Sequence, residues 1–126
     1  MIVNNESDEL AELIEKLKAY RIGEWNVLLG REQDWRCIYC EKDLLETFDA
    51  YNSWQWDHVI PQSAGGQHVL ENIALCCKTC NWLKNTYSPG GITKSERLLD
   101  AKNYIQKQRA AYDLELSEIR SVARSY

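Results

Sequence analysis

Two Cys-x-x-Cys pairs constrain the fold of this chain more than any other feature of its sequence. Cys37 and Cys40 form the first pair, and Cys77 and Cys80 form the second. Each pair can bend around a metal ion, and four thiolates complete the closed tetrahedral shell that is typical of structural zinc. The sequence therefore predicts a Zn²⁺ ion that joins two segments separated by residues 41–76.

Disulfide bonds explain these cysteines less well than a metal does. The cysteine count is five, and Cys76 lies outside both pairs. A reducing cytosol disfavours disulfides, and neither pair lies in the strand–helix context of a thioredoxin-like redox motif. We expect Cys76 to be a small buried residue at the end of a strand.

Length and composition indicate one ordinary globular domain. The chain has 126 residues, of which 44% are apolar and 27% are charged, and these values are typical of a soluble domain. No apolar run approaches the roughly 18 residues that a membrane-spanning helix needs. Residues 1–6 lack the basic-then-apolar order of a secretion signal, so we expect a cytoplasmic protein without a membrane partner.

Hydrophobic spacing predicts helices at both ends of the chain. The N-terminal helix follows Ser7, its expected N-cap, and a second short helix is expected over residues 25–31. A long C-terminal helix follows residues 93–96, whose Thr-x-x-Glu pattern forms a capping box. Its apolar stripe includes Leu98, Ile105, Tyr112 and Ile119. We favour packing of this stripe on the body of the protein; a dimer or partner-binding helix is the alternative.

The middle of the chain predicts strand, loop, strand and helix in that order. Trp54 and Trp56 alternate with polar residues in a strand that Pro61 ends, a second strand fits residues 73–76, and a helix should run from Cys80 through Lys84. We therefore predict a single α+β domain over residues 1–126. Its parts are an N-terminal helical segment (1–30), a metal module (31–90) and the C-terminal helix (91–126).

A polar motif lies between and after the cysteine pairs. Asp57-His58 precedes Val-Ile-Pro and a Gly-Gly loop, Asn72 follows Glu71, and Asn81 follows the second cysteine pair directly. This pattern, over about residues 31–88, resembles the HNH endonuclease family, including the HNH domain of RNA-guided CRISPR nucleases and small phage and bacterial HNH nucleases. The family pattern is Asp-His-x-x-Pro, a central Asn, and a final His or Asn after the second cysteine pair.

The resemblance implies a ββα-metal fold, a structural zinc and metal-dependent hydrolysis of DNA. It implies that His58 acts as general base on the attacking water, and that Asp57 and Asn81 hold a divalent ion, Mg²⁺ or Mn²⁺. It further implies that Asn72 braces the loop that orients the base and that Lys84 faces a substrate phosphate. A histidine base and a hard cation suit this chemistry at neutral pH. In a regular strand, Asp57 and His58 would point to opposite faces, so the strand must twist or end near residue 57.

The charge distribution complicates DNA binding. The net charge is −4, and only residues 91–126, with seven basic and five acidic side chains, are basic. Around the cysteine pairs, we expect Arg36, Lys78 and Lys84 to contact nucleic acid; the basic residues of the C-terminal helix offer a second track. Because phosphate neutralisation drives non-specific affinity, we expect weak binding, or a homodimer or protein partner that delivers the DNA.

Other interpretations remain open at this point. The chain could be a zinc-stabilised module that binds nucleic acid, or docks to a partner, without cutting. We expect His68, in the polar loop, to be solvated. We expect Trp54 and Trp56 to pack behind the strand, with base stacking as the alternative.

Overall fold

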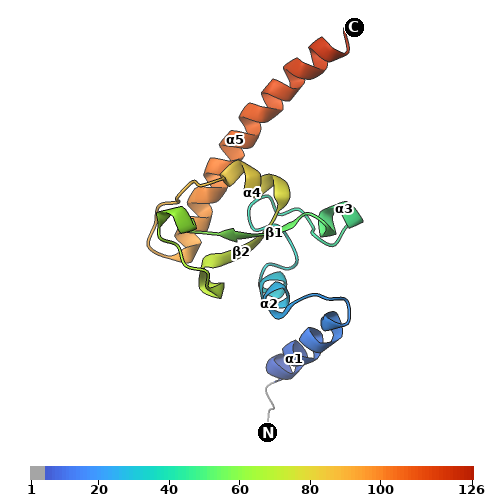
Figure 1. Ribbon diagram of the computed structural model, residues 1–126, viewed down its shortest axis with the longest axis vertical. Coiled ribbons are helices and arrows are strands. Elements are labelled where there is room, and N and C mark those ends of the chain that lie inside the picture. The colour runs from blue at the N-terminus through green and yellow to red at the C-terminus, as the bar shows by residue number, and fades with distance from the viewer. Residues whose placement is uncertain (1–4) are drawn as a thin grey trace.

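The computed structural model describes residues 5–126 as a central hairpin and helix with a longer helix on either side along the chain. The elements in chain order are α1 (Asn5–Lys18), α2 (Glu24–Glu32), α3 (Phe48–Tyr51), β1 (Trp54–His58), η1 (Gln62–Ala64), η2 (Leu70–Asn72), β2 (Ile73–Cys77), α4 (Lys78–Lys84) and α5 (Lys94–Ala123). α1 and the end of α5 project in opposite directions from the central part (Figure 1). Residues 1–4 of the segment considered for a secretion signal lie outside the described residues. No helix in the described part of the chain combines the length and hydropathy needed to cross a membrane.

β1 and β2 form a two-stranded antiparallel sheet. Trp54 lies opposite Cys77 at one end, and His58 lies opposite Ile73 at the other. Every residue of β2 is buried, whereas β1 is only partly covered. α4 follows β2 directly, so the predicted strand, loop, strand and helix are confirmed.

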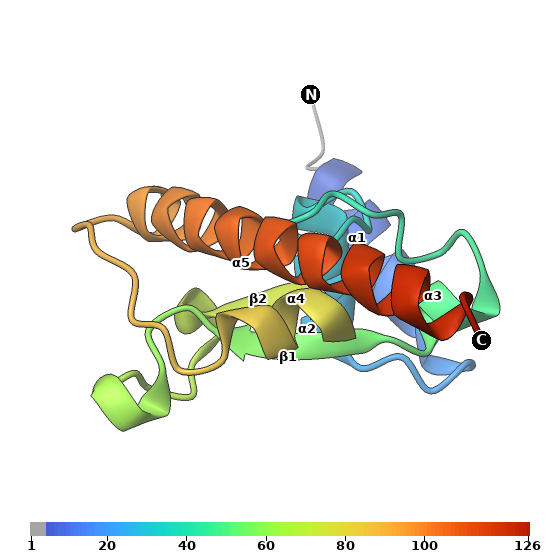
Figure 2. The ribbon, with the colours of Figure 1, turned by 90° about the horizontal axis from the view of Figure 1, so that it is seen from above.

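The hydrophobic core lies around β2. α2 contributes Leu29, the segment after it contributes Tyr39 and Leu44, and α5 contributes Ile105, all packed into one cluster with Leu75. α5 passes alongside α4 and the sheet (Figure 2). Because both faces of β2 are covered, its side chains are apolar without alternation, and their burial stabilises the strand.

The N-terminal helix starts earlier than predicted. α1 begins at Asn5, so Ser7 lies inside the helix and the prediction that it forms the N-cap is wrong. The first turn then contains Glu6 as well as Asp8, and negative side chains interact favourably with the positive end of the helix dipole. α2 spans Glu24–Glu32, close to the predicted range.

α5 begins as its sequence predicts but packs along only part of its length. The Thr93 hydroxyl accepts from the backbone N–H of Glu96, whose carboxylate accepts from the N–H of Thr93, forming the expected capping box. Ala101 and Ile105 are buried against the body. Residues 110–126 are all exposed, so the prediction that the stripe packs on the body holds for the first part of the helix only.

Candidate metal centre and active site

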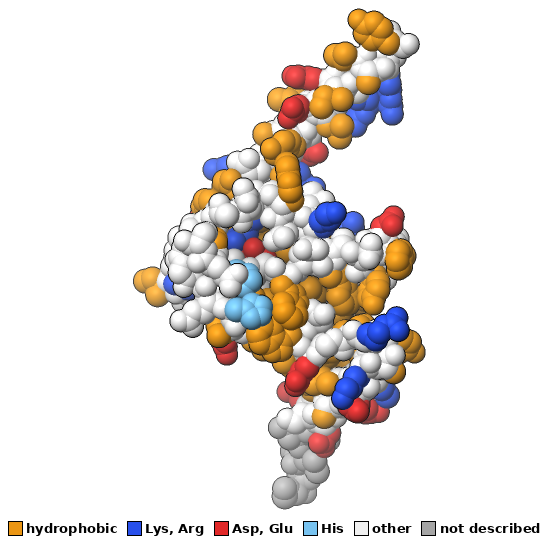
Figure 3. Space-filling model, in the orientation of Figure 1, with side chains coloured by type: hydrophobic (Ala, Val, Ile, Leu, Met, Phe, Trp, Pro, Cys, Tyr) orange, Lys and Arg blue, Asp and Glu red, His pale blue; other side chains and the backbone are white. Residues whose placement is uncertain are grey.

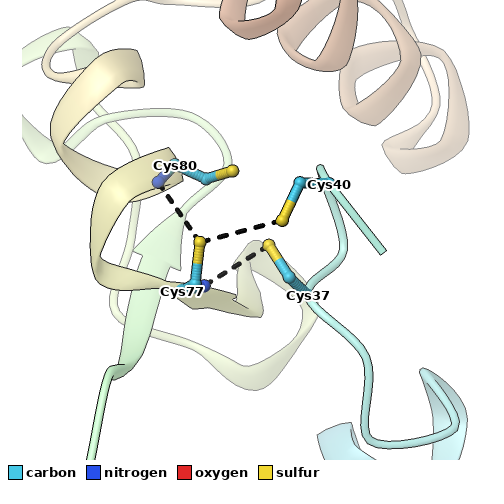
Figure 4. A group of neighbouring side chains, drawn as sticks. All are labelled: Cys37, Cys40, Cys77 and Cys80. Atoms are coloured by element: carbon cyan, nitrogen blue, oxygen red, sulfur yellow. Dashed lines mark hydrogen bonds between the residues drawn. The ribbon is translucent and has the colours of Figure 1, made fainter. Parts of the chain in front are cut away.

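The four paired cysteines come together at one end of the hairpin. Cys37 and Cys40 come from the segment after α2, Cys77 ends β2, and Cys80 lies on α4 (Figure 4). Their Sγ atoms all lie within 4.8 Å of one another, and those of Cys40 and Cys77 are 3.8 Å apart. Tetrahedral zinc with Zn–S bonds of about 2.3 Å requires sulfur separations of about 3.8 Å. The group is therefore consistent with a structural zinc site.

Donors around the cluster favour the thiolate form. The backbone N–H of Cys77 donates to Cys37 Sγ at 3.3 Å, and that of Cys80 donates to Cys77 Sγ at 3.4 Å. Arg109 Nη2, on α5, donates to Cys80 Sγ at 3.4 Å. Four thiolates around a divalent cation leave two negative charges, which a guanidinium partly compensates. Arg109 was predicted only as part of a basic track; its position four residues after Ile105, on the packed face of the helix, is the signal that could have revealed it.

Cys76 does not belong to this cluster. It is fully buried in β2, and burial raises the pKa of its thiol. It is thus a neutral, packed side chain, as predicted.

Asp57 lies at the other end of the hairpin and is also buried. Its side chain is 4% exposed, the Tyr39 hydroxyl donates to its Oδ2, and Lys84 Nζ lies 3.2 Å from its Oδ1. Burial raises the pKa of the Asp57 carboxyl, while the Lys84 ammonium and the Tyr39 hydroxyl oppose that rise. The two partners thus compensate the cost of placing a carboxylate inside the protein.

Lys84 occupies a position that its sequence context did not predict. Its side chain is 0% exposed, and its Nζ also donates to the backbone carbonyl of His58 at 3.0 Å. This buried ammonium does not lie on the surface, so the prediction that it faces a substrate phosphate disagrees with its place in the fold. It instead fastens α4 to the end of β1, where Asp57 and His58 lie.

His58 and His68 form a pair at the end of β1. His58 Nε2 lies 2.9 Å from His68 Nδ1, and the two rings lie side by side on one face of the molecule (Figure 3). His68 is exposed, as expected of a loop residue, but its ring contacts another imidazole and is not simply solvated. Both of the chain's histidines flank a loop that contains Pro61 and two glycines. This arrangement is the sequence signal that could have predicted the contact between them.

Asn72 holds the loop that carries His68. Its Oδ1 accepts from the backbone N–H of Ile60 at 2.9 Å, and its Nδ2 donates to the carbonyls of Ile60 and Gln67 at 3.0 Å each. Gly66 allows this loop to close, because a Cβ there would lie 1.7 Å from the carbonyl oxygen of Ile60. Asn72 therefore connects the segment after His58 to the segment before His68.

A cavity of about 340 Å³ opens beside these residues. β1 contributes Trp56, Asp57 and His58 to its wall, and Asn81 comes from α4. The remaining lining residues are Pro61, Gln62, Ser63, Asn85 and Thr86. An imidazole, a carboxylate and a side-chain amide thus border one cavity.

The HNH endonuclease family model matches residues 37–95, which include the cysteine cluster and the cavity residues Asp57, His58 and Asn81. The segment that forms the hairpin, α4 and the cysteine cluster is therefore similar to this family. No curated protein and no solved structure matches the chain. The predicted HNH architecture is confirmed: a two-strand hairpin plus helix, a four-cysteine cluster, an N-terminal helix and a long C-terminal helix.

The basic residues expected near the HNH site differ in their surroundings. Arg36 is exposed, and its Nη1 donates to the backbone carbonyl of Glu41 at 3.1 Å. Lys78 is exposed at the start of α4. Both side chains therefore remain on the surface of the HNH module, unlike that of Lys84.

The two tryptophans of β1 also differ. Trp54 is half-buried, and its Nε1 donates to the carbonyl of Leu44 at 2.9 Å, as expected of a residue packed behind the strand. Trp56 is 39% exposed and borders the cavity, so the prediction that it packs behind the strand is wrong.

Proposed function

We propose that this protein is a metal-dependent DNA endonuclease that hydrolyses phosphodiester bonds at the cavity beside β1 and α4. The observation that supports this proposal is that Asp57, His58 and Asn81, from two elements, border the same cavity. The match of residues 37–95 to the HNH endonuclease family supports a nucleic-acid substrate. The four cysteines lie at the opposite end of the hairpin, so they have a separate, structural task.

His58 is the proposed general base. Its Nε2 is engaged with His68 Nδ1, whereas its Nδ1 has no hydrogen-bond partner among residues 5–126. In the tautomer that leaves Nδ1 unprotonated, Nε2–H donates to His68, and Nδ1 can take a proton from water. His68 is thus a positioning residue that fixes the tautomer and the orientation of the base.

Asp57 and Asn81 are the proposed ligands of a divalent cation, Mg²⁺ or Mn²⁺. Carboxylate and amide oxygens suit these hard ions, and each Asp57 oxygen has one partner in the fold and a lone pair to spare. When bound, such a cation stabilises the negative charge that develops on the phosphate oxygens. Lys84 positions Asp57 through the buried ion pair between them. Asn72 positions the loop, and both act through other residues.

Cys37, Cys40, Cys77 and Cys80 would hold Zn²⁺ in a closed shell. Such a site has no open position for substrate, so its contribution is to folding stability. Arg36 and Lys78 remain the proposed phosphate contacts of the module. With a net charge of −4, these contacts give weak affinity, and we retain a homodimer or a protein partner as the means of delivering DNA.

Cleavage of supercoiled plasmid in the presence of Mg²⁺ tests the proposal. We expect His58→Ala to lower the rate at least about 100-fold, because general-base catalysis contributes about 10²–10⁴-fold. Zinc content and thermal melting of the variant serve as controls and should match those of the natural chain. Equal cleavage by both proteins would assign the activity elsewhere, and nucleic-acid binding with no cleavage by the natural chain would favour a binding module.

A further inference from the structure

Three aromatic rings form a continuous surface next to the cavity. This aromatic surface consists of Trp25 from α2, Trp56 from β1 and His68 from the loop. The ring centroids of Trp25 and Trp56 are 5.3 Å apart, those of Trp25 and His68 5.4 Å, and those of Trp56 and His68 5.9 Å. Hydrophobic side chains gather beside the two histidines on this face (Figure 3).

The aromatic surface reaches the proposed active site directly. Trp56 and His58 lie two residues apart on β1, so their side chains share one face of the strand. His68 contacts His58 through its ring nitrogen, and Trp56 borders the cavity together with Asp57 and Asn81. If one part of a ligand lies on these rings, the part next to it would therefore lie in the cavity.

The rings are fixed before any ligand arrives. Trp56 Nε1 donates to Asn26 Oδ1 at 2.6 Å, which sets the orientation of the indole. Asn72 and the close approach at Gly66 hold the loop that presents His68. A preformed surface loses little conformational entropy on binding. The exposed 39% of Trp56 can therefore contact a ligand without a further loss of side-chain freedom.

We infer that the aromatic surface stacks an unpaired nucleobase next to the phosphate that is cut, so that the enzyme prefers single-stranded or locally unpaired DNA. Stacking on aromatic side chains needs the flat face of a base, and a base inside a duplex has both faces covered by its neighbours. Stacking also does not depend on phosphate neutralisation, which is weak in a chain with a net charge of −4. The position of the base relative to the cut phosphate rests on the proposed nuclease function; the stacking surface itself does not.

Binding of two oligonucleotides with identical phosphates tests the stacking surface. The probes are fluorescein-labelled dT12 and a twelve-unit strand of abasic sites, measured by fluorescence anisotropy without added magnesium. Since one stacked base contributes roughly 5- to 150-fold to affinity, the natural chain should bind dT12 at least about tenfold more tightly than the abasic strand. Equal binding of the two strands would overturn the inference without any variant being needed.

Variants locate the preference on the surface. Trp56→Leu keeps an apolar side chain on the strand and should remove the preference for dT12, whereas Trp56→Phe should retain most of it. Trp82→Leu is the matched control, because Trp82 is 63% exposed on α4 and contacts Tyr112 instead of the histidines. A preference that persists in Trp56→Leu would overturn the inference; if that variant fails to fold, Trp25→Leu replaces it under the same criterion.

Cleavage kinetics separate this inference from the proposed function. With magnesium, Trp56→Leu should raise KM for a single-stranded substrate about tenfold and change kcat less than about twofold, and the preference for single strands over a duplex of the same sequence should fall. A change confined to kcat, or higher activity on the duplex than on the single strand, would overturn the inference. Tight, base-dependent binding without cleavage would support the stacking surface and overturn the nuclease function.

Discussion

Replacing Lys84 by Met tests how the candidate site is held together. The ammonium is fully buried, 3.2 Å from Asp57 Oδ1 and 3.0 Å from the carbonyl of His58. Met fills a similar volume, so the main loss is electrostatic: Asp57 keeps its bond to Tyr39 but becomes a buried charge without a counterion. Breaking a buried pair in this way costs about 3–5 kcal/mol.

The loss should be easy to measure by thermal unfolding of the zinc-loaded protein. For a domain of this size, about 1 kcal/mol shifts Tm by roughly 3–5 °C, so Lys84→Met should melt about 10–20 °C lower. Lys102→Met is the matched control, because Lys102 Nζ lies 3.4 Å from Glu41 Oε2 in a pair whose side chains are 30% and 73% exposed. Such surface pairs contribute about 0–1 kcal/mol, so the control should shift Tm by only a few degrees.

Two further measurements isolate the charge. In the background of Asp57→Asn, which keeps an acceptor for Tyr39, Lys84→Met should cost much less than in the natural chain. The deficit should also shrink as pH falls below the raised pKa of Asp57. Losing the ammonium raises the pKa of Asp57 further, and protonation removes its buried charge. The cost is therefore fully present above the raised folded-state pKa, and it declines as pH falls from that pKa towards the ordinary pKa of an aspartate. A Lys84→Met protein that melts within about 2 °C of the natural chain would refute the reasoning.

Three other expectations concern the metal centre and the loop. Cys40→Ser should lose zinc and unfold the module, because structural zinc contributes on the order of 10 kcal/mol; zinc analysis with circular dichroism checks this, and a folded, zinc-free variant would contradict it. Arg109→Met should weaken zinc binding about tenfold in chelator competition, with Lys107→Met as the exposed control. Equal zinc affinities of Arg109→Met and the natural chain would show that Arg109 does not stabilise the metal centre. Asn72→Ala should lower kcat roughly 10- to 100-fold by displacing the loop, with little change in KM or zinc content. Asn72→Asp should not restore the rate, because a carboxylate can accept from the N–H of Ile60 but cannot donate to the carbonyls of Ile60 and Gln67; a change in KM alone would indicate a contact with substrate instead.

The parts of the fold that were predicted correctly depend on short-range patterns. The Cys-x-x-Cys spacing, the alternation around Trp56 and the Thr93–Glu96 capping box each involve residues only a few positions apart. Local geometry then determines the outcome, as the cysteine cluster, β1 and the start of α5 confirm. The start of α1 was the exception, since any of several polar residues can serve as a helix boundary.

The errors within the candidate site have a common physical origin. Lysine is almost never fully buried unless it is paired, and the partner of Lys84, Asp57, lies far away in the sequence. The contact between His58 and His68 depends on loop closure at Gly66. The exposure of Trp56 depends on what the rest of the chain leaves uncovered. The spacing of residues in the sequence predicts on which face of a helix or strand a side chain lies. It does not predict which distant residue that side chain contacts.

The pairing of β1 with β2 has a consequence for how zinc loss would affect catalysis. Cys77 sits at one end of the ladder opposite Trp54, and His58 sits at the other end. Because side chains alternate along a strand, a slip of the pairing by one residue would turn His58 towards the opposite side of the sheet. An ion bound to Cys77 would prevent that slip, and through Cys80 it would also set the rotation of α4, whose residue Asn81 borders the cavity. Removal of that ion should therefore abolish the proposed cleavage by releasing the register of the hairpin as the module unfolds, even though no cysteine takes part in the proposed reaction.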